Sequence, residues 1–335
     1  MALSHFGEDQ GIKAIVSMKE LISVVIPTYN RSYVLRQTLP TYLRQPSVGE
    51  VIVVDDGSTD HTQETLQSIE RLSPIPLRIL KHARRRGVAA ARNSGALTAA
   101  YPLILYGEDD VLLDEEYAAI LAARRRILQA DLIAGRIIYL LPGETPEDGR
   151  RRYDALPSHA SGFLRRRLGE FDLNSKITGE QEVPFVHSIF LTPTELARQI
   201  RFDEHYKGNA YREESDFQIE LRKFGGKVMI TDHTTCYHLP RVQASVGGNH
   251  GQHWLIYEYW TIRNNNYFIH KHYPMLKECL GWNCTESQIK KDFALYRWRE
   301  WIKPRLIHDL RETLRPVIPA FVLDFVRRHR TAARS

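Results

Sequence analysis

The chain has 335 residues, of which 43% are hydrophobic and 26% are charged, a composition that is ordinary for a globular protein. No apolar run approaches the roughly 20 residues that span a bilayer, and three cysteines are too few for a disulfide framework. The net charge of +6 indicates an anionic partner, such as nucleic acid, a phosphorylated ligand or an anionic membrane, although a basic surface without a partner is an equal alternative. The length fits one large domain with elaborations, or one domain with a C-terminal appendage.

The N-terminal residues 1–20 are expected to form an extension outside the fold. They lack the basic region and the long apolar core of a signal peptide, and Met18 is an alternative start to Met1. Together with the low cysteine content, this predicts a reducing, cytoplasmic location.

Two β-branched, continuously apolar runs follow, at residues 21–27 and 50–56. Such runs are typical of strands that are buried on both faces of a parallel sheet. Residues 31–45 between them read as a helix, which Pro40 should kink or interrupt. The spacing predicts a β-α-β crossover.

The pattern continues with alternating helices and strands. Asp60, with Gln63 three residues later, resembles a capping box and predicts a helix start. Residues 76–82 and 101–106 read as strands, and residues 87–100 between them form a small-residue helix that should pack closely on the sheet.

Carboxylates stand at the predicted C-terminal ends of two strands: Asp55 and Asp56 after one, and Glu108, Asp109 and Asp110 after the other. In open α/β sheets, ligands bind outside the carboxyl ends of the strands. Neither a G-x-G-x-x-G nor a P-loop motif occurs, which argues against a dinucleotide-dependent dehydrogenase and a P-loop NTPase. Adjacent carboxylates suit Mg²⁺ or Mn²⁺ shared with substrate phosphates.

The second half is predicted to contain further helices and strands. Residues 114–129 read as a helix, 131–140 as a strand, and 141–177 as a loop. Thr192–Glu195 marks a helix start. Residues 211–226 form a helix that ends at Gly225, followed by a strand-like run at 227–238.

The C-terminal region 241–335 is rich in aromatic and basic residues and is predicted to be helical. Its last part, residues 302–335, mixes apolar and basic turns. It is expected either to pack on the preceding domain or to lie on an anionic membrane, where it would meet a lipid-linked acceptor at the inner face.

Five segments occur in the order and spacing of the family-2 glycosyltransferases, which the chain resembles from about residue 21 to residue 238. They read SVVIPTYNR, EVIVVDDGSTDHT, GVAAARNSGA, LYGEDDV and YREESDF…LRKFGG. The resemblance implies a GT-A fold at 21–240, a mostly parallel α/β sheet flanked by helices, with a helical C-terminal extension. It also implies an inverting transfer from a nucleotide-diphosphate sugar to a saccharide or lipid-linked acceptor, with Mg²⁺ or Mn²⁺.

The resemblance also implies which residues hold the nucleotide. They are Pro27, Thr28, Tyr29, Asn30, Asp56, Arg92 and Asn93. Asp56 would hydrogen-bond the base. The alternatives are a turn or capping role for Asp55 and Asp56, and a structural ion pair for Arg92.

The acidic triplet resembles the family's metal motif, in which Asp110 and then Asp109 are the firmest matches. Glu108 departs from the usual aspartate and could reach the metal differently. His238 matches a histidine that completes the metal shell in some relatives, or it is a structural histidine. The sequence also places His233 and Cys236 near His238, but three irregularly spaced ligands make a poor zinc site.

Glu213 and Glu214 resemble the Glu-Asp pair of the family, whose second acid is the proposed base. At a helix N-terminus the dipole favours the ionised carboxylate, so Glu214 is the candidate base, with Glu213 and Asp216 as substitutes. These acids could instead merely complement the helix dipole.

Two other functions remain open at this stage. A nucleotidyltransferase could share a similar nucleotide domain, but the chain lacks the Gly-rich basic loop after its first strand. A non-catalytic RNA-binding protein could use the basic runs at 83–87, 124–126 and 165–167, which are scattered along the chain. We therefore expect no nucleic-acid partner.

Overall fold

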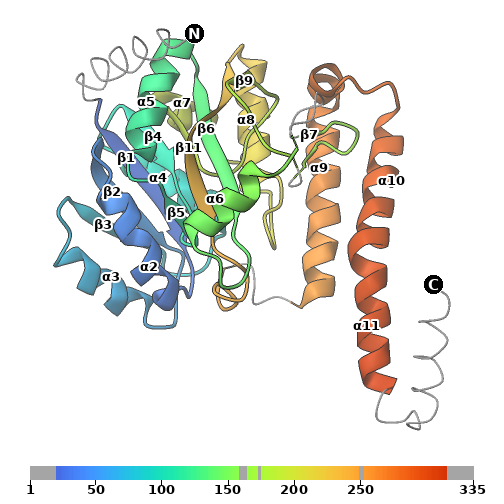
Figure 1. The fold of residues 1–335 in the computed structure, drawn as a ribbon, viewed down its shortest axis with the longest axis horizontal. Coiled ribbons are helices and arrows are strands. Elements are labelled where there is room, and N and C mark those ends of the chain that lie inside the picture. Colours follow the sequence, from blue (N-terminus) through green and yellow to red (C-terminus); the bar gives the residue numbers. More distant parts are fainter. Residues whose placement is uncertain (1–19, 158–163, 173–174, 249–252, 315–335) are drawn as a thin grey trace.

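A mixed β-sheet with helices on both faces forms the body of the protein (Figure 1). The computed structural model describes residues 20–157, 164–172, 175–248 and 253–314. Within these residues the sheet has nine strands in the order β3-β2-β1-β4-β10-β6-β11-β5, where β5 is Val111–Leu113 and β9 (Gln181–Glu182) is paired to β11. The predicted α/β fold with a helical C-terminal region is therefore confirmed.

The first half of the chain builds the parallel part of the sheet. Strand β1 pairs in parallel with both β2 and β4, and β2 pairs with β3. The elements are β1 (Ile22–Thr28), α2 (Ser32–Leu43), β2 (Val48–Asp55), α3 (Thr62–Glu70), β3 (Leu77–Lys81), α4 (Val88–Thr98) and β4 (Leu103–Tyr106). Each corresponds to a predicted element. Helix α2 nevertheless continues through Pro40, so the expected interruption does not occur.

The second half adds strands of both directions. Strand β10 (Phe190–Pro193) is antiparallel to both β4 and β6 (Leu132–Tyr139), and β6 is parallel to β11 (Val228–His238). Strand β11 therefore points the same way as β4. As a result, the residues after β4 and the end of β11 meet at one edge of the sheet, although they are more than 100 residues apart in sequence.

Alternating side chains on the central strands explain why both faces of the sheet are covered. On β1, Val24 and Ile26 enter the core under α2 and α5 (Tyr117–Leu128), whereas Val25 enters the core under α4. Helix α4 can approach closely because a Cβ on Gly95 would lie 2.3 Å from Val25 Cγ1. The expected close packing of this small-residue helix is thus observed.

The segment 141–177 differs from its prediction as a loop. It contains α6 (Pro146–Asp154) and the two-stranded pair β7 (Leu164–Arg165) and β8 (Glu170–Phe171). Helix α6 begins with a capping box, in which Thr145 and Asp148 each accept a hydrogen bond from the backbone N–H of the other. Thr145 and Asp148 have the spacing of a capping box in the sequence, but the many charged residues around them led to the prediction of a loop.

Two predicted helix starts also move. Thr192 and Pro193 belong to β10, because they pair with β4, and α7 (Thr194–Ile200) begins only after them. Helix α5 begins at Tyr117 rather than at residue 114, since Asp114 accepts hydrogen bonds from Arg150 and from the β11 backbone.

The C-terminal helices are α9 (Trp254–Leu280), α10 (Glu286–Arg297), a π-helical turn (Trp298–Ile302) and α11 (Lys303–Leu314). Helix α9 packs against α8 (Glu213–Lys223), and its side chains Phe268 and Leu276 join the core under α4. In Figure 1, α10 and α11 run in line beside α9, and α11 extends past the end of α9.

None of the helices in the described residues is long and apolar enough to cross a membrane. The predicted extension at 1–20 lies almost entirely outside the described residues, as do residues 315–335 of the predicted membrane-associated tail. Membrane contact and the domain boundary at residue 240 therefore stay predictions.

Candidate active site

A cavity of about 460 Å³ opens at the edge of the sheet where β1, β4 and β11 end. Helix α8 closes one side with its N-terminus. The cavity is lined by ten of the residues that the sequence singled out: Pro27, Thr28, Tyr29, Asp56, Glu108, Asp109, Asp110, Glu213, Glu214 and His238. The other four, Asn30, Arg92, Asn93 and Asp216, are not among the lining residues.

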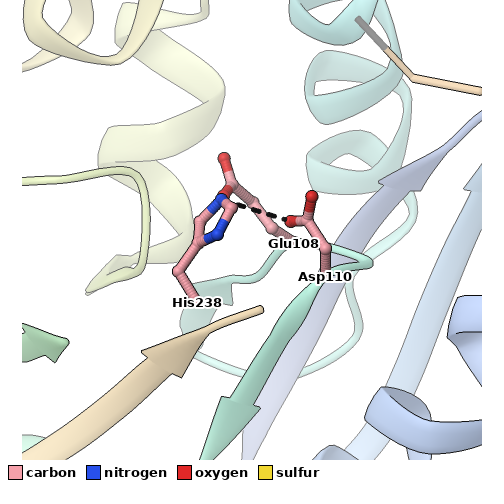
Figure 2. A group of neighbouring side chains, drawn as sticks. All are labelled: Glu108, Asp110 and His238. Carbon is pink, nitrogen blue, oxygen red and sulfur yellow. Dashed lines mark ion pairs between the residues drawn. The ribbon is translucent and has the colours of Figure 1, made fainter. Parts of the chain in front are cut away.

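Glu108, Asp110 and His238 turn their side chains toward one another in this cavity (Figure 2). Each offers one ligand atom, and these atoms lie within 4.8 Å of one another. His238 Nε2 is 3.7 Å from Asp110 Oδ1. A histidine from β11 thus joins two acids from the loop after β4, as the resemblance implied.

The hydrogen bond of His238 at Nδ1 directs its other ring nitrogen, Nε2, toward the two acids, where a cation would replace any proton on it. Its Nδ1 lies 2.8 Å from the Leu239 carbonyl oxygen and can only donate there, which leaves the Nε2 lone pair for a ligand. The Tyr139 ring stacks on the imidazole at 4.9 Å. Burial opposes a positive charge on the ring, but the Asp110 and Glu108 carboxylates outweigh it and raise the pKa of His238.

The three side chains fit a divalent cation. Mg²⁺ prefers ligands at about 2.0–2.1 Å in an octahedron, in which neighbouring ligand atoms lie about 2.9 Å apart and opposite ones about 4.2 Å, so the cluster would contract around the cation. Two carboxylates with one imidazole suit Mn²⁺ equally well. The suggested zinc cluster is not formed, because the Cys236 thiol is buried and points to the Arg136 carbonyl oxygen.

Asp109 is held differently from its neighbours. Its Oδ2 accepts a hydrogen bond of 2.7 Å from Thr28, and its Oδ1 is 3.9 Å from Arg31 Nε. Burial raises the pKa of Asp109, an effect that the Arg31 charge opposes and the Asp110 charge reinforces. Asp109 therefore ties β1 to the loop after β4, and Glu108 takes the place in the cluster that the sequence had favoured for Asp109.

Arg92 links the two acid groups of the site. Its side chain is almost fully buried, pairs with Glu213, and reaches Glu108 with Nη2 at 3.2 Å from Oε1. Arg92 forms the structural ion pair that was one of its two alternatives, and its contact with a nucleotide stays a prediction. The two ion pairs of Arg92 fix the position of the loop after β4 relative to the N-terminus of α8.

Glu213 and Glu214 occupy different environments although they are adjacent. Glu213 is 2% exposed and paired to Arg92. The Glu214 carboxylate lies half-buried on the cavity wall, and within the described part of the chain no other residue donates a hydrogen bond to it. Burial raises the pKa of Glu214, and the nearby Arg92 charge limits the rise. Of the two acids, Glu214 is the one that is not paired and that lines the cavity, and its role as base stays a prediction.

Asp216 does not fit its proposed role as a substitute base. Its carboxylate is 1% exposed and points away from the cavity, where it binds Tyr206, Lys271 and His272 at 2.6–3.0 Å. Three donors hold it between α8 and α9. Asp216 is therefore a structural residue.

Three of the predicted nucleotide-binding residues already make hydrogen bonds within the protein. Both Asp56 oxygens accept hydrogen bonds from the backbone N–H groups of residues 86 and 87, and His82 lies 2.7 Å away. Asn30, at φ +53, binds the backbone of Thr59. Asn93 binds the backbone of Phe202 through both its amide atoms. These residues shape the loops around the cavity, and their contact with a nucleotide stays a prediction.

The sequence did not single out several residues that line the cavity. They include Arg31, Tyr139, Glu170, His187 and Arg212. Arg31 directly follows Asn30 in the SVVIPTYNR segment, so the sequence motif could have indicated it. Arg212 lies within the YREESDF segment, next to Glu213. Tyr139, Glu170 and His187 come from segments that carry no such motif.

The mixed sheet, with acidic residues at the carboxyl end of β4 and helices on both faces, has the architecture of the GT-A fold. The chain belongs to glycosyl transferase family 2, whose family model matches residues 23–199.

Known proteins with sequence or fold similarity cover most of the chain. Validoxylamine A glucosyltransferase of Streptomyces hygroscopicus subsp. limoneus is 32% identical across 84% of this chain, which spans only 63% of that relative. The crystal structure of S. aureus TarS 1-349 in complex with UDP-GlcNAc aligns over 84% of this chain and 73% of its own, at 17% identity and a TM-score of 0.53. The structure of GalNAc-T7 with UDP, GalNAc and Mn²⁺ aligns over 87% and 58%, at 17% identity and 0.56. At such identities the two structures establish the fold alone.

Replacing Arg92 tests its bridging role. Arg92→Met leaves the buried Glu213 without a counter-charge, so the free energy of unfolding should fall by about 3–5 kcal/mol. The double variant Arg92→Met/Glu213→Leu should recover part of this loss. Urea unfolding followed by circular dichroism measures both.

Arg167→Met provides the control, because its ion pair with Asp292 is on the surface and should contribute at most about 1 kcal/mol. Equal losses for Arg92→Met and Arg167→Met would contradict the bridge.

Proposed function

We propose that the chain transfers a sugar from a UDP-sugar to an acceptor hydroxyl in one metal-dependent displacement that inverts the anomeric centre. The observation that carries the proposal is the division of carboxylates in one cavity. Glu108 and Asp110 converge with His238 on a cation position, whereas Glu214 stands apart without a partner among the described residues.

The cation position accounts for the donor. A diphosphate could not approach three carboxylates without a counter-charge, and Arg31 and Arg92 offset only part of their charge. When bound, Mg²⁺ or Mn²⁺ neutralises charge on the diphosphate. Two structural neighbours, TarS in complex with UDP-GlcNAc and GalNAc-T7 with UDP, GalNAc and Mn²⁺, support UDP as the nucleotide.

Glu214 accounts for the transfer. Its ionised carboxylate accepts the proton of the acceptor hydroxyl as that oxygen attacks the anomeric carbon from the side opposite the diphosphate. Because a single displacement needs only one catalytic carboxylate, Glu213 is free to remain paired with Arg92. Orientation of donor and acceptor in the cavity supplies much of the remaining rate.

For the acceptor, we propose only a chemical class, a molecule with a free hydroxyl group. The relative from Streptomyces hygroscopicus is named for glucosyl transfer to validoxylamine A, which supports a glycosyl transfer to a hydroxylated acceptor here. A saccharide or a lipid-linked acceptor satisfies the same chemistry.

The basic runs offer little support for nucleic-acid binding. Arg86 pairs with Glu204, Arg124 with Glu180, and Arg165 with Asp172. Each run is therefore partly neutralised by carboxylates of the same chain, unlike a continuous phosphate-binding stripe.

Two substitutions should separate donor binding from transfer. Asp110→Ala removes a cation ligand and should abolish metal-dependent binding of UDP, while Glu214→Gln should preserve that binding and lower turnover of UDP-sugar by at least about 100-fold. Calorimetric titration with UDP and Mn²⁺ measures binding, and release of UDP measures turnover.

Glu195→Gln is the control, because this carboxylate is on the surface of α7 and should change neither quantity. Normal turnover by the Glu214 variant would show that another group is the base.

Turnover should also depend on pH through Glu214. A protonated carboxyl cannot accept the hydroxyl proton, and burial raises the pKa of Glu214, so kcat/KM should fall with decreasing pH before it reaches the ordinary glutamate value of about 4.3. The profile of kcat/KM against pH measures this. UDP binding over the same range separates it from protonation of the cation ligands, and a profile that stays flat down to that ordinary value would argue against Glu214.

A further inference from the structure

Arg212 is a buried cation on the wall of the active-site cavity. It immediately precedes Glu213 and Glu214, lines the cavity, and is 4% exposed. Its backbone lies in the left-handed region, at φ +78. Non-glycine residues in this region are uncommon, and they cluster at functional sites.

Three aromatic rings surround the Arg212 guanidinium. Its Cζ lies 4.9 Å from the ring centre of Tyr211, 5.2 Å from that of Phe268 and 5.7 Å from that of Phe185. The rings come from the turn before α8, from α9, and from the segment before β10. They fix the side chain at one position and stabilise its charge only in part.

The hydrogen bonds of Arg212 go to neutral acceptors. Nε donates to Asn265 Oδ1 at 3.0 Å, and Nη2 donates to the Leu168 carbonyl oxygen at a long 3.4 Å. Across the described residues, no carboxylate lies within ion-pair distance of the guanidinium, and Nη1 has no hydrogen-bond partner.

The other arginines of the cavity differ from Arg212. Arg31 is buried but pairs with Asp109 and Asp110. Arg85 is exposed, so water can solvate its charge, and it lies over the Tyr29 ring. A buried charge without a counter-ion is costly. The Glu214 carboxylate is near enough for the Arg212 charge to lower its pKa, but the two groups do not form a direct ion pair. Among the described residues, Arg212 therefore has no carboxylate in direct contact.

We propose that Arg212 is an anion-binding residue that pairs with a phosphate or carboxylate oxyanion of a substrate in this cavity. This inference rests on the proposed function. A fixed, planar guanidinium suits such oxyanions because it can donate two parallel hydrogen bonds. The oxyanion comes either from the diphosphate of the donor or from a charged group on the acceptor.

Three variants test the proposal. Arg212→Met removes the charge and keeps a side chain that fits between the rings, and Arg212→Lys restores the charge without the planar fork. Arg263→Met is the matched control, because Arg263 also lies over an aromatic ring, that of Trp260, but is not among the lining residues. Thermal unfolding of each variant reports on packing separately.

The probes are UDP with Mg²⁺, and inorganic phosphate added to the complex of the protein with UDP and Mg²⁺. If the donor diphosphate is the partner, Arg212→Met should weaken UDP binding about tenfold or more. If the partner is a second anion, UDP binding should stay within twofold while the wild type binds phosphate and Arg212→Met does not. In both cases Arg212→Lys should lie between, and Arg263→Met should match the wild type.

Unchanged binding of both probes by Arg212→Met would overturn the proposal, as would equal losses in Arg212→Met and Arg263→Met. Failure of the wild type to bind UDP with Mg²⁺ would instead contradict the proposed function. In that case phosphate is titrated into the protein without UDP. The proposal for Arg212 stands if the wild type and Arg263→Met bind phosphate and Arg212→Met does not, and it fails if all three behave alike.

Discussion

The buried Arg92 guanidinium is the interaction on which the site depends. One end of it pairs with Glu108, in the loop after β4, and the other with Glu213, at the start of α8. These carboxylates would repel each other in a dry interior, where an unpaired charge is costly. With Arg92 between them, the cluster of Glu108, Asp110 and His238 and the unpaired carboxylate of Glu214 can share one cavity.

The mixed sheet provides the second constraint. Because β10 runs antiparallel between β4 and β6, strand β11 returns in the direction of β4 and delivers His238 beside Asp110. The parallel half of the sheet and the half that carries His238 are thus parts of one continuous layer. Helix α9 supports the second half through α8, with Asp216 held by Lys271 and His272.

Local patterns predicted much of this arrangement. The apolar runs before Asp56 and Glu108 defined β2 and β4, and their acidic ends marked the edge where the cavity opens. What could not be predicted depends on distant partners: the ion pair of Arg92 with Glu213 joins residues 121 apart in sequence. Asp216, on the same helix turn, was predicted as a substitute for Glu214, and only the packing of α9 shows that it faces away from the cavity.

The most direct measurement is a thermal-shift comparison of the protein with UDP, GDP, CDP and dTDP, each with Mn²⁺ and with a chelator. The account predicts that UDP raises the unfolding temperature only when Mn²⁺ is present, because binding to the folded state alone stabilises it. Equal stabilisation by UDP in the chelator, or no stabilisation by any nucleotide with Mn²⁺, would contradict a donor site built on Glu108, Asp110 and His238.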